Sequence, residues 1–380
     1  MSTPTPPHPR TPSPAPRPAT AATAPVWANP QRQAHFWAWF ARIAPAHQLQ
    51  AHSLQVASAD ASFRRYFRVS GQGGSFIIMD APPEHENCQR FVQVAQLMAA
   101  AGLRVPQVLD WEPAQGFMLL SDLGTQTLLQ AINPSQPEAN RHWYLQAVDA
   151  LIAWQTASRP GVLPPYDSAL LQRELSLFPD WYVAQHRRYN LTQAQLHTLQ
   201  AQFARIVAHN LAWPGSVYVH RDFMPRNLIV APHAPATAAS ARIGVLDFQD
   251  AVYGPISYDI ASLLQDAFIS WDEDFCLDIT VRYWEQARRA SLPVGDDFGA
   301  FYQAVQWMGL QRHLKVAGIF ARLTLRDGKP HYLADAPRFI GYIRTTCARY
   351  RALTPLLRLL DEVEGTAPIQ HLTLGRDGRL

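Results

Sequence analysis

Lysine is nearly missing from this chain of 380 residues, and cysteine is rare. Lys315 and Lys329 are the two lysines, so the other basic side chains among the 33 lysines and arginines are arginines. A site that needs a lysine anywhere before the C-terminal part is therefore excluded. The three cysteines, Cys88, Cys276 and Cys347, are scattered and odd in number. Their spacing gives neither a metal site nor a disulfide framework, and it indicates a reducing cytoplasm.

Long apolar runs and a strong excess of charge are also missing. No apolar stretch approaches the roughly 20 residues of a transmembrane helix, and no charged-then-apolar leader precedes the fold. We therefore expect a cytoplasmic protein without a membrane span. Charged residues make up only 17% and the formal net charge is +3, which is too weak a basic excess to indicate nucleic-acid binding. The hydrophobic content of 48% is sufficient for a sizeable core, and the length fits two lobes or domains.

Proline is concentrated at the start of the chain. Ten of the 31 prolines lie in residues 1–30, among alanine, threonine and serine and without an apolar period. Such a segment cannot bury a core, so we predict a disordered tail there. Residues 366–380 are expected to be a loose tail at the other end.

The most informative stretch of the chain is 217–259. His220-Arg221-Asp222 follows an apolar strand pattern, and Asn227 stands five residues after Asp222. A second apolar run ends in Asp247-Phe248-Gln249. This layout is typical of a kinase catalytic loop, H-R-D-x-x-x-x-N, followed by a metal-binding aspartate. The segments 227–230 and 242–246 are expected to pair as a hairpin, which brings Asn227 and Asp247 to one end of a ribbon.

Phosphoryl transfer explains why these residue types are needed. The reaction depends on positioning and charge neutralisation more than on covalent help. In this interpretation Asp222 is the catalytic base that takes or orients the acceptor's proton. Asn227 and Asp247 hold Mg²⁺, a hard cation that prefers oxygen ligands. His220 is interpreted as structural, and Asp259 either caps the following helix or braces the catalytic loop; we favour a structural role for it.

The flanking patterns predict an α+β, protein-kinase-like bilobal fold. We expect a small five-stranded nucleotide-binding N-lobe over 31–122 and a mainly helical catalytic and substrate-binding C-lobe over 123–365. The N-lobe strands are expected in 54–69 (two strands), 75–81, 108–111 and 116–120, with helices at 30–51 and 84–101. Helical spacing recurs in the C-lobe at 147–157, 172–188, 194–209, 260–264, 275–290, 298–322 and 337–360.

The predicted nucleotide site departs from the usual kinase pattern. A typical kinase carries a phosphate-gripping lysine on the third strand, but Phe76-Ile77-Ile78-Met79 occupies that place here. We predict that an arginine of the second strand replaces the lysine; the candidates are Arg64, Arg65 and Arg68. Alternation puts Arg64 and Arg68 on one face and Arg65 on the other. The alternative is three solvated arginines on an edge strand.

Two further segments complete the predicted nucleotide site. The loop over 59–63 is not rich in glycine, but its small residues permit a close approach to phosphate; Asp60, Ser62 and Phe63 are the candidates there. The segment 121–124 is expected to be the hinge, with adenine pairing to backbone groups around Ser121 and Leu123. The alternative is a plain interdomain turn.

The segment after the metal-binding aspartate indicates the type of acceptor. The chain passes from Asp247 to Tyr258-Asp259 within twelve residues. A protein kinase needs a longer activation segment that ends in an Ala-Pro-Glu-like motif, and none is present. The acceptor is therefore expected to be a small molecule.

These motifs resemble those of a known family. The catalytic residues together with Tyr258-Asp259-Ile-Ala are similar to the aminoglycoside phosphotransferase superfamily, which includes the choline kinases. Longer stretches resemble its subgroup of bacterial anomeric kinases of cell-wall recycling: 60–68, 79–83, 120–124, 178–182 and 307–323. The resemblance spans about residues 31–360, and the missing lysine fits this subgroup.

The resemblance implies an ATP- and Mg²⁺-dependent enzyme with an amino sugar as its partner. Members of the subgroup phosphorylate the C1 hydroxyl of N-acetylmuramate and N-acetylglucosamine, which gives the sugar α-1-phosphate for peptidoglycan recycling. A monomer in the cytoplasm, with no nucleic-acid or membrane partner, is expected. The alternatives are a kinase of another small alcohol, such as an amino alcohol or an aminoglycoside, and a nucleotide-binding pseudokinase without activity.

Four residues are candidates for binding the sugar. Asp180 and Trp181 place a carboxylate beside an aromatic face, an arrangement that grips sugar hydroxyls and ring faces. Gln311 and Arg312 lie on one predicted helix, and an arginine there could pair with the lactyl carboxylate of N-acetylmuramate. The alternatives are core packing for Trp181 and a helix-surface ion pair for Arg312.

Overall fold

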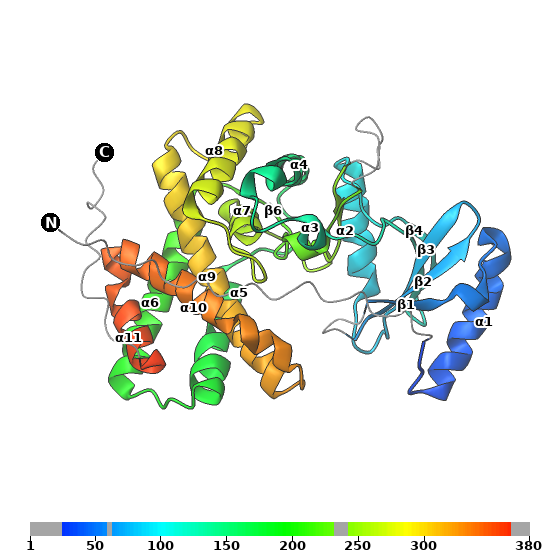
Figure 1. Ribbon diagram of the computed structural model, residues 1–380, viewed down its shortest axis with the longest axis horizontal. Helices are drawn as coiled ribbons and strands as arrows, with labels where there is room; N and C mark the ends of the chain where they lie inside the picture. Colours follow the sequence, from blue (N-terminus) through cyan, green and yellow to red (C-terminus); the bar gives the residue numbers. More distant parts are fainter. Residues whose placement is uncertain (1–24, 59–62, 232–241, 366–380) are drawn as a thin grey trace.

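The computed structural model describes residues 25–58, 63–231 and 242–365. Two lobes lie side by side (Figure 1): a small lobe built on a β-sheet, and a larger lobe made mainly of helices. The catalytic stretch identified in the sequence belongs to the larger lobe. The segments 1–24, 59–62 and 366–380 lie outside the described residues, so most of the two expected tails is not part of the description below.

The small lobe contains the predicted five-stranded sheet. All neighbouring strands are antiparallel, in the order β1-β2-β3-β5-β4. The strands are β1 (Gln55–Ser58), β2 (Arg65–Gly71), β3 (Gly74–Asp80), β4 (Val108–Glu112) and β5 (Phe117–Ser121). The predicted α+β fold with a small sheet-containing N-lobe is therefore confirmed.

Two helices cover the two faces of this sheet. Helix α1 (Pro30–His47) buries the four apolar residues that its spacing predicted, and they pack against β2, β3 and β5; these residues are Phe36, Trp39, Phe40 and Ile43. Helix α2 (Cys88–Ala100) covers the opposite face and lies between the sheet and the second lobe (Figure 1). A short 3₁₀ turn, η1 (Ala51–Ser53), leads from α1 towards β1.

The residues just before α1 also pack onto the sheet. Asn29 caps the helix, because its side chain accepts hydrogen bonds from the first-turn N–H groups. The Trp27 ring lies 4.8 Å from the Phe36 ring and 5.8 Å from the Phe67 ring. The end of the proline-rich segment, from Pro25 onward, is thus in contact with the small lobe.

The larger lobe is helical around two small strand pairs. Its helices are α3 (Leu128–Ala131), α4 (Pro137–Thr156), α5 (Ser168–Leu177), α6 (Gln193–Ala212), α7 (Ser257–Leu264), α8 (Glu273–Arg289), α9 (Phe298–Leu325), α10 (Ala336–Arg349) and α11 (Thr354–Glu364). Shorter turns connect them: the π-helix η2 (Phe178–His186) and the 3₁₀ turns η3 (Pro225–Asn227), η5 (Pro330–Asp335) and η6 (Arg351–Leu353). Strand β6 (Ser216–Val219) pairs with β9 (Val252–Pro255), and β7 (Leu228–Ile229) pairs with β8 (Gly244–Val245).

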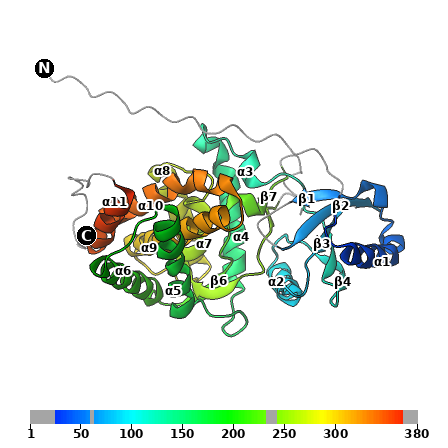
Figure 2. The same cartoon turned by 90° about the horizontal axis from the view of Figure 1, so that it is seen from below.

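Helix α9 is the central element of this lobe. Figure 2 shows it surrounded by α5, α6, α7 and α10, and it contacts all four. The middle section of α9 is buried on every side. Its buried residues include four polar ones: Gln311, Arg312, His313 and Lys315. A helix that buries its whole circumference forms the core of a lobe, and here it places charged groups within that core.

One predicted helix is two helices in the structure. The pattern over 337–360 predicted a single element, but α10 ends at Arg349 and α11 begins at Thr354. Pro355 explains the break, because proline fits the first turn of a helix but not the interior of one. Among the helices of the described residues, none has the length and hydropathy needed to span a membrane.

Candidate active site

The catalytic loop lies between β6 and η3 and is held by a buried carboxylate. Asp259, in the first turn of α7, is completely buried. Its Oδ2 accepts a hydrogen bond from the His220 N–H at 2.7 Å, and its Oδ1 accepts one from the Arg221 N–H at 3.0 Å. Burial raises the pKa of Asp259 to about 7, against the lowering effect of these two bonds. Of the two roles considered for Asp259, these contacts are those of a loop brace.

His220 connects the loop to the strand that precedes Asp247. Its Nε2 lies 3.0 Å from the Leu246 carbonyl oxygen, and its Nδ1 accepts a hydrogen bond from the Asp222 N–H at 3.2 Å. A carbonyl can only accept, so the ring carries its proton on Nε2. Burial lowers the pKa of His220 to about 4, and the ring is therefore neutral at pH 7.

Asn227 connects Asp222, the predicted base, to the second aspartate of the motif. Its Nδ2 donates to the Asp222 carbonyl at 2.9 Å and lies 3.4 Å from Asp247 Oδ2. Gln249 Nε2 donates to Asp247 Oδ1 at 2.9 Å. The β7–β8 pair produces this convergence, as the hairpin predicted from the sequence required.

The donor set at this point fits a magnesium ion bound together with phosphate. Both amide protons of Asn227 are used by Asp222 and Asp247, so its Oδ1 is the atom that could bind a cation. The carboxylate of Asp247 supplies further oxygen atoms. Mg²⁺ in nucleotide sites is held by one or two carboxylates and by phosphate oxygens, and not by an all-protein cage.

A buried ionic network lies behind the catalytic loop, and the sequence did not predict it. Glu174 of α5 binds the Arg221 guanidinium, the Tyr166 hydroxyl and, at 3.0 Å, the Lys315 ammonium of α9. Lys315 Nζ also donates to the Tyr258 hydroxyl at 3.3 Å. Burial opposes the ionisation of Glu174, but the two cations outweigh it and hold its pKa below the ordinary value. The signal available in the sequence was Lys315, one of only two lysines in the chain, inside a predicted helix.

This network sets the electrostatic environment of Asp222. Burial alone raises the pKa of Asp222. Nearby positive charges outweigh burial and hold the pKa below its ordinary value; the largest contributions come from Lys315, Arg312 and Arg221. Asp222 is therefore ionised at neutral pH and able to accept a proton.

Each of the three arginines proposed for the nucleotide site has a carboxylate partner. Arg64 Nη2 lies 2.6 Å from Glu86 Oε2, and Arg68 Nε lies 2.6 Å from Asp122 Oδ2. Arg65 binds Asp80, which Arg32 also binds at 2.6 Å.

The loop before these arginines is only partly described. Asp60 and Ser62 lie outside the described residues. Phe63 is exposed, and its ring stacks on the His85 ring at 4.3 Å.

The predicted hinge follows β5 directly. The Ser121 hydroxyl oxygen accepts a hydrogen bond from the Gln107 N–H at 2.9 Å. The Leu123 carbonyl oxygen accepts one from the Arg104 guanidinium. Pairing of adenine with backbone groups around Ser121 and Leu123 stays a prediction.

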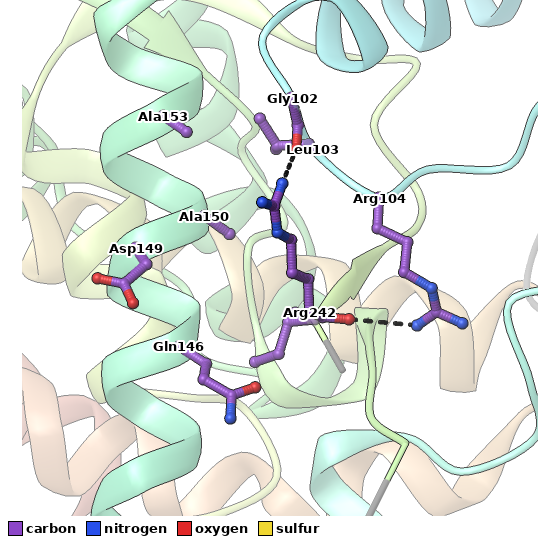
Figure 3. A pocket seen from close by; sticks show the side chains of 9 residues that line it. Gly102, Leu103, Arg104, Gln146, Asp149, Ala150, Ala153 and Arg242 are labelled. Atoms are coloured by element: carbon purple, nitrogen blue, oxygen red, sulfur yellow. Dashed lines mark hydrogen bonds between the residues drawn. The ribbon is translucent and has the colours of Figure 1, made fainter. Parts of the chain in front are cut away.

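A cavity of about 410 Å³ lies beside the hinge (Figure 3). The segment 102–104 after α2, one face of α4, and Arg242 with Ile243 line it. Arg242 donates to the Gly102 carbonyl at 3.4 Å, and Arg104 donates to the Arg242 carbonyl at 3.3 Å. These bonds tie the small lobe to the segment that enters β8, and the lining includes none of the predicted site residues.

The predicted sugar-binding residues fall into two groups. Asp180 is exposed and Trp181 is partly buried, and both belong to η2, which packs against α9. Gln311 is fully buried and donates its amide to the Leu171 carbonyl at 2.9 Å. Arg312 is only 2% exposed, and its Nη2 lies 3.5 Å from the Met224 sulfur of the catalytic loop. The structure thus places Arg312 against the catalytic loop, in the core and not on a helix surface.

Comparison with known proteins shows the family of the chain. A profile of the phosphotransferase enzyme family matches residues 53–294. The N-acetylmuramate/N-acetylglucosamine kinase of Neisseria meningitidis is 46% identical over 342 residues, which cover 90% of this chain and 98% of that protein. The kinase of the same name from Pseudomonas putida is 47% identical over 320 residues, which cover 84% of this chain and 91% of that protein.

A solved structure supports the fold independently. The choline kinase of Cryptosporidium parvum has a TM-score of 0.56 at 9% identity, and the match covers 85% of this chain and 99% of that one. The resemblance drawn from the motifs is confirmed by these matches. The chain belongs to the phosphotransferase enzyme family.

Proposed function

We propose that this protein transfers the γ-phosphoryl group of ATP to the anomeric C1 hydroxyl of N-acetylmuramate and N-acetylglucosamine. The product is the sugar α-1-phosphate, and we place the reaction in the cytoplasm, where ATP is held. The observation that carries the proposal is that the Asn227 side chain bonds both the Asp222 main-chain carbonyl and the Asp247 carboxylate, which brings these three residues together. The acceptor is inferred from the relatives, which are named for these two sugars.

The residues have distinct roles in the proposed reaction. Asp222 accepts the proton of the C1 hydroxyl as the sugar oxygen forms its bond to the γ-phosphorus. The bond from that phosphorus to the bridging oxygen breaks at the same time, and ADP leaves. An anomeric hydroxyl is more acidic than an ordinary alcohol, so one ionised carboxylate suffices as base. Asn227 and Asp247 would hold Mg²⁺, which when bound neutralises charge on the phosphate oxygens.

Contacts of the loop support this assignment of the base. The Asp222 carboxylate is kept ionised by the cations of α9 and by Arg221. The backbone on either side of Asp222 is fixed through Asp259, His220 and Asn227. A base held in one position and one charge state is what positioning catalysis requires.

The sugar site is proposed next to the same loop. Arg312 lies against Met224 of the loop, and it stays our candidate for the acidic side chain of N-acetylmuramate. Asp180 and Trp181 belong to a π-helical segment, a backbone form often found at functional sites. They stay candidates for the sugar ring, and Gln311 for orienting the helix that carries Arg312.

An acceptor panel tests the function. The purified protein is incubated with Mg²⁺, ATP and one acceptor at a time, and ADP release is followed. N-acetylmuramate and N-acetylglucosamine are expected to support turnover, and the methyl glycoside of N-acetylglucosamine, which lacks the C1 hydroxyl, is expected to support none. Turnover with the methyl glycoside would contradict the anomeric site. Turnover with choline or aminoglycosides, but not with the two sugars, would contradict the acceptor class.

A further inference from the structure

The three arginines around β2 lie on different faces of the sheet. Arg65 faces α1, since its guanidinium lies 4.2 Å from the centre of the Trp27 ring and 5.4 Å from that of Phe67. Side chains alternate along a strand, so Arg68 lies on the opposite face. Arg64, just before β2, binds Glu86 beside the start of α2, the helix that covers this opposite face. That face carries α2 and is directed towards the second lobe (Figure 1). Of the three, Arg65 is thus turned away from the second lobe.

The two remaining arginines bind different partners: Arg64 lies just before β2, and Arg68 lies in its middle. Arg68 binds the Asp122 carboxylate and donates to the Gly124 carbonyl at 3.2 Å, so it is fixed at the hinge. Arg64 binds Glu86, two residues before α2 begins. Both side chains of the Arg64–Glu86 pair are only 12% exposed. Of these two cations, Arg68 is therefore bound at the hinge and Arg64 beside the start of α2.

The beginning of α2 is connected to the segment that follows Asp247. The Phe91 ring lies 4.9 Å from the Phe248 ring. Arg90 Nη2 donates to the Ala251 carbonyl at 3.2 Å. The Arg64–Glu86 pair therefore lies beside a helix that contacts the segment after Asp247, and Arg68 lies at the hinge, where adenine is expected.

We propose that Arg64, supported by Glu86, grips the phosphates of the nucleotide in place of the lysine that β3 lacks. The inference rests on the proposed use of ATP. A nucleotide with its base at the hinge directs its phosphates towards Asp247, and Arg64 lies beside the helix that contacts the segment after Asp247. The chain has no lysine before residue 315, so a cation in this lobe must be an arginine or a histidine.

The chemistry of the pair suits this role. A guanidinium carries five N–H groups in a planar fork and can bind a carboxylate and a phosphate at the same time. Glu86 fixes the direction of the Arg64 side chain and partly balances its charge when no nucleotide is bound. Because Glu86 precedes α2 directly, the pair also couples the position of that helix to the bound phosphates.

Binding of ADP and adenosine tests the assignment without any sugar. Affinities for ADP, for ATP with Mg²⁺ and for adenosine are measured by calorimetry on the full-length protein and on Arg64→Gln. We expect Arg64→Gln to bind ADP and ATP about 10- to 100-fold more weakly, because a charge-assisted hydrogen bond to the phosphates is lost. Adenosine binding is expected to stay unchanged. Arg64→Lys keeps the charge and should recover part of the affinity, and Glu86→Gln should give a smaller loss than Arg64→Gln.

A matched ion pair in the same lobe provides the control. Arg42 lies 2.9 Å from Glu112 on the far side of the sheet, so Arg42→Gln should bind all three ligands like the unmodified protein. Wild-type ADP affinity in Arg64→Gln would overturn the inference. An equal loss of adenosine and ADP affinity would overturn it as well, because a phosphate grip does not act on the nucleoside. Since no acceptor is involved, these results decide the role of Arg64 even if neither amino sugar is phosphorylated.

Discussion

At the scale of single residues, two positions of the candidate active site have an unfavourable backbone conformation. Arg221 and Asp247 have φ angles of 76° and 62°, in the left-handed region that side chains other than glycine rarely adopt. Such residues cost on the order of 1–3 kcal/mol each and persist where neighbouring contacts hold them. Asp259 binds the N–H of Arg221, and Gln249 binds the Asp247 carboxylate. The same contacts therefore hold the backbone at Arg221 and orient the Asp247 carboxylate.

The role of Asp222 as base predicts a loss of turnover without a loss of nucleotide binding. Asp222→Asn keeps the size of the side chain but cannot accept the proton. We expect kcat to fall by about 10²- to 10⁴-fold, the usual contribution of a general base. ADP affinity, measured by calorimetry, should change little. Near-normal turnover in this variant would remove Asp222 from the role of base.

A buried histidine predicts how stability depends on pH. Burial, with the charge of Arg312, lowers the pKa of His313 to about 3. As the pH falls, the imidazole is therefore protonated in the unfolded chain before it is protonated in the folded protein. The stability that the neutral ring contributes is complete above about pH 6.5 and is lost as the pH falls through about 3. Burial raises the pKa of Asp259 to about 7 and that of Asp266 to about 6. These two groups have the opposite effect, because the stability that their protonated forms contribute is lost as the pH rises.

A variant separates the histidine from these carboxyl groups. His313→Gln keeps an amide N–H for the Gln265 carbonyl but does not titrate. Between pH 7 and pH 4, the free energy of unfolding of the unmodified protein should fall by about 3 kcal/mol more than that of His313→Gln, as measured by urea unfolding. Substitution of the exposed His35 by glutamine serves as the control and should leave the pH dependence unchanged. A constant difference between the unmodified protein and His313→Gln would contradict the account.

At the scale of helices and strands, α9 shows what the sequence could and could not predict. The apolar spacing over 298–322 predicted the helix, because periodicity depends only on local sequence. It did not predict that Arg312 and Lys315 are buried, since charged residues are rarely placed in a core. The carboxylate partner of Lys315 is Glu174, which is far away in the sequence and reaches Lys315 only after α5 has packed on α9. Spacing within one element carries no information about such a partner.

Close packing of α9 predicts opposite effects for two glycines. A Cβ at Gly318 would lie 2.3 Å from the backbone carbonyl of Leu177, so Gly318→Ala should destabilise the protein by about 1–3 kcal/mol. Gly341 is exposed on α10, and a Cβ added there would meet no atom within 4 Å, so Gly341→Ala should stabilise by about 0.5–1 kcal/mol through helix propensity. Denaturant unfolding of both variants measures this. Equal effects at the two positions would show that α9 does not pack as described.

At the scale of the whole molecule, the two lobes and their order were predictable, but the contacts between them were not. The period-two pattern of the strands predicted the five-stranded lobe. The H-R-D-x-x-x-x-N spacing predicted the loop with Asp222. The hydrogen bond from Arg104 to the Arg242 carbonyl, and the contact of Phe91 with Phe248, join segments distant in sequence and depend on the final packing. The partner of each arginine in β2 was unpredictable for the same reason.

Binding of nucleotide across the lobes predicts a stabilisation that depends on Asp247. A ligand at 100 times its Kd stabilises the folded protein by about 2.7 kcal/mol, so Mg²⁺ with ATP should raise the Tm of the unmodified protein. Asp247→Asn removes the carboxylate charge but tolerates the left-handed backbone at this position. The Mg²⁺-dependent part of the Tm increase should be lost in this variant, while its Tm without ligand stays close to that of the unmodified protein. An unchanged Mg²⁺ dependence would contradict the metal assignment.

The position of the phosphate on the product tests the central claim most directly. The product from N-acetylmuramate, Mg²⁺ and ATP is analysed by ³¹P NMR with and without proton decoupling. The account predicts a phosphorus signal coupled to the anomeric proton of an α-sugar. A phosphorus coupled to a proton elsewhere on the ring, or no phosphorylated sugar at all, would contradict it.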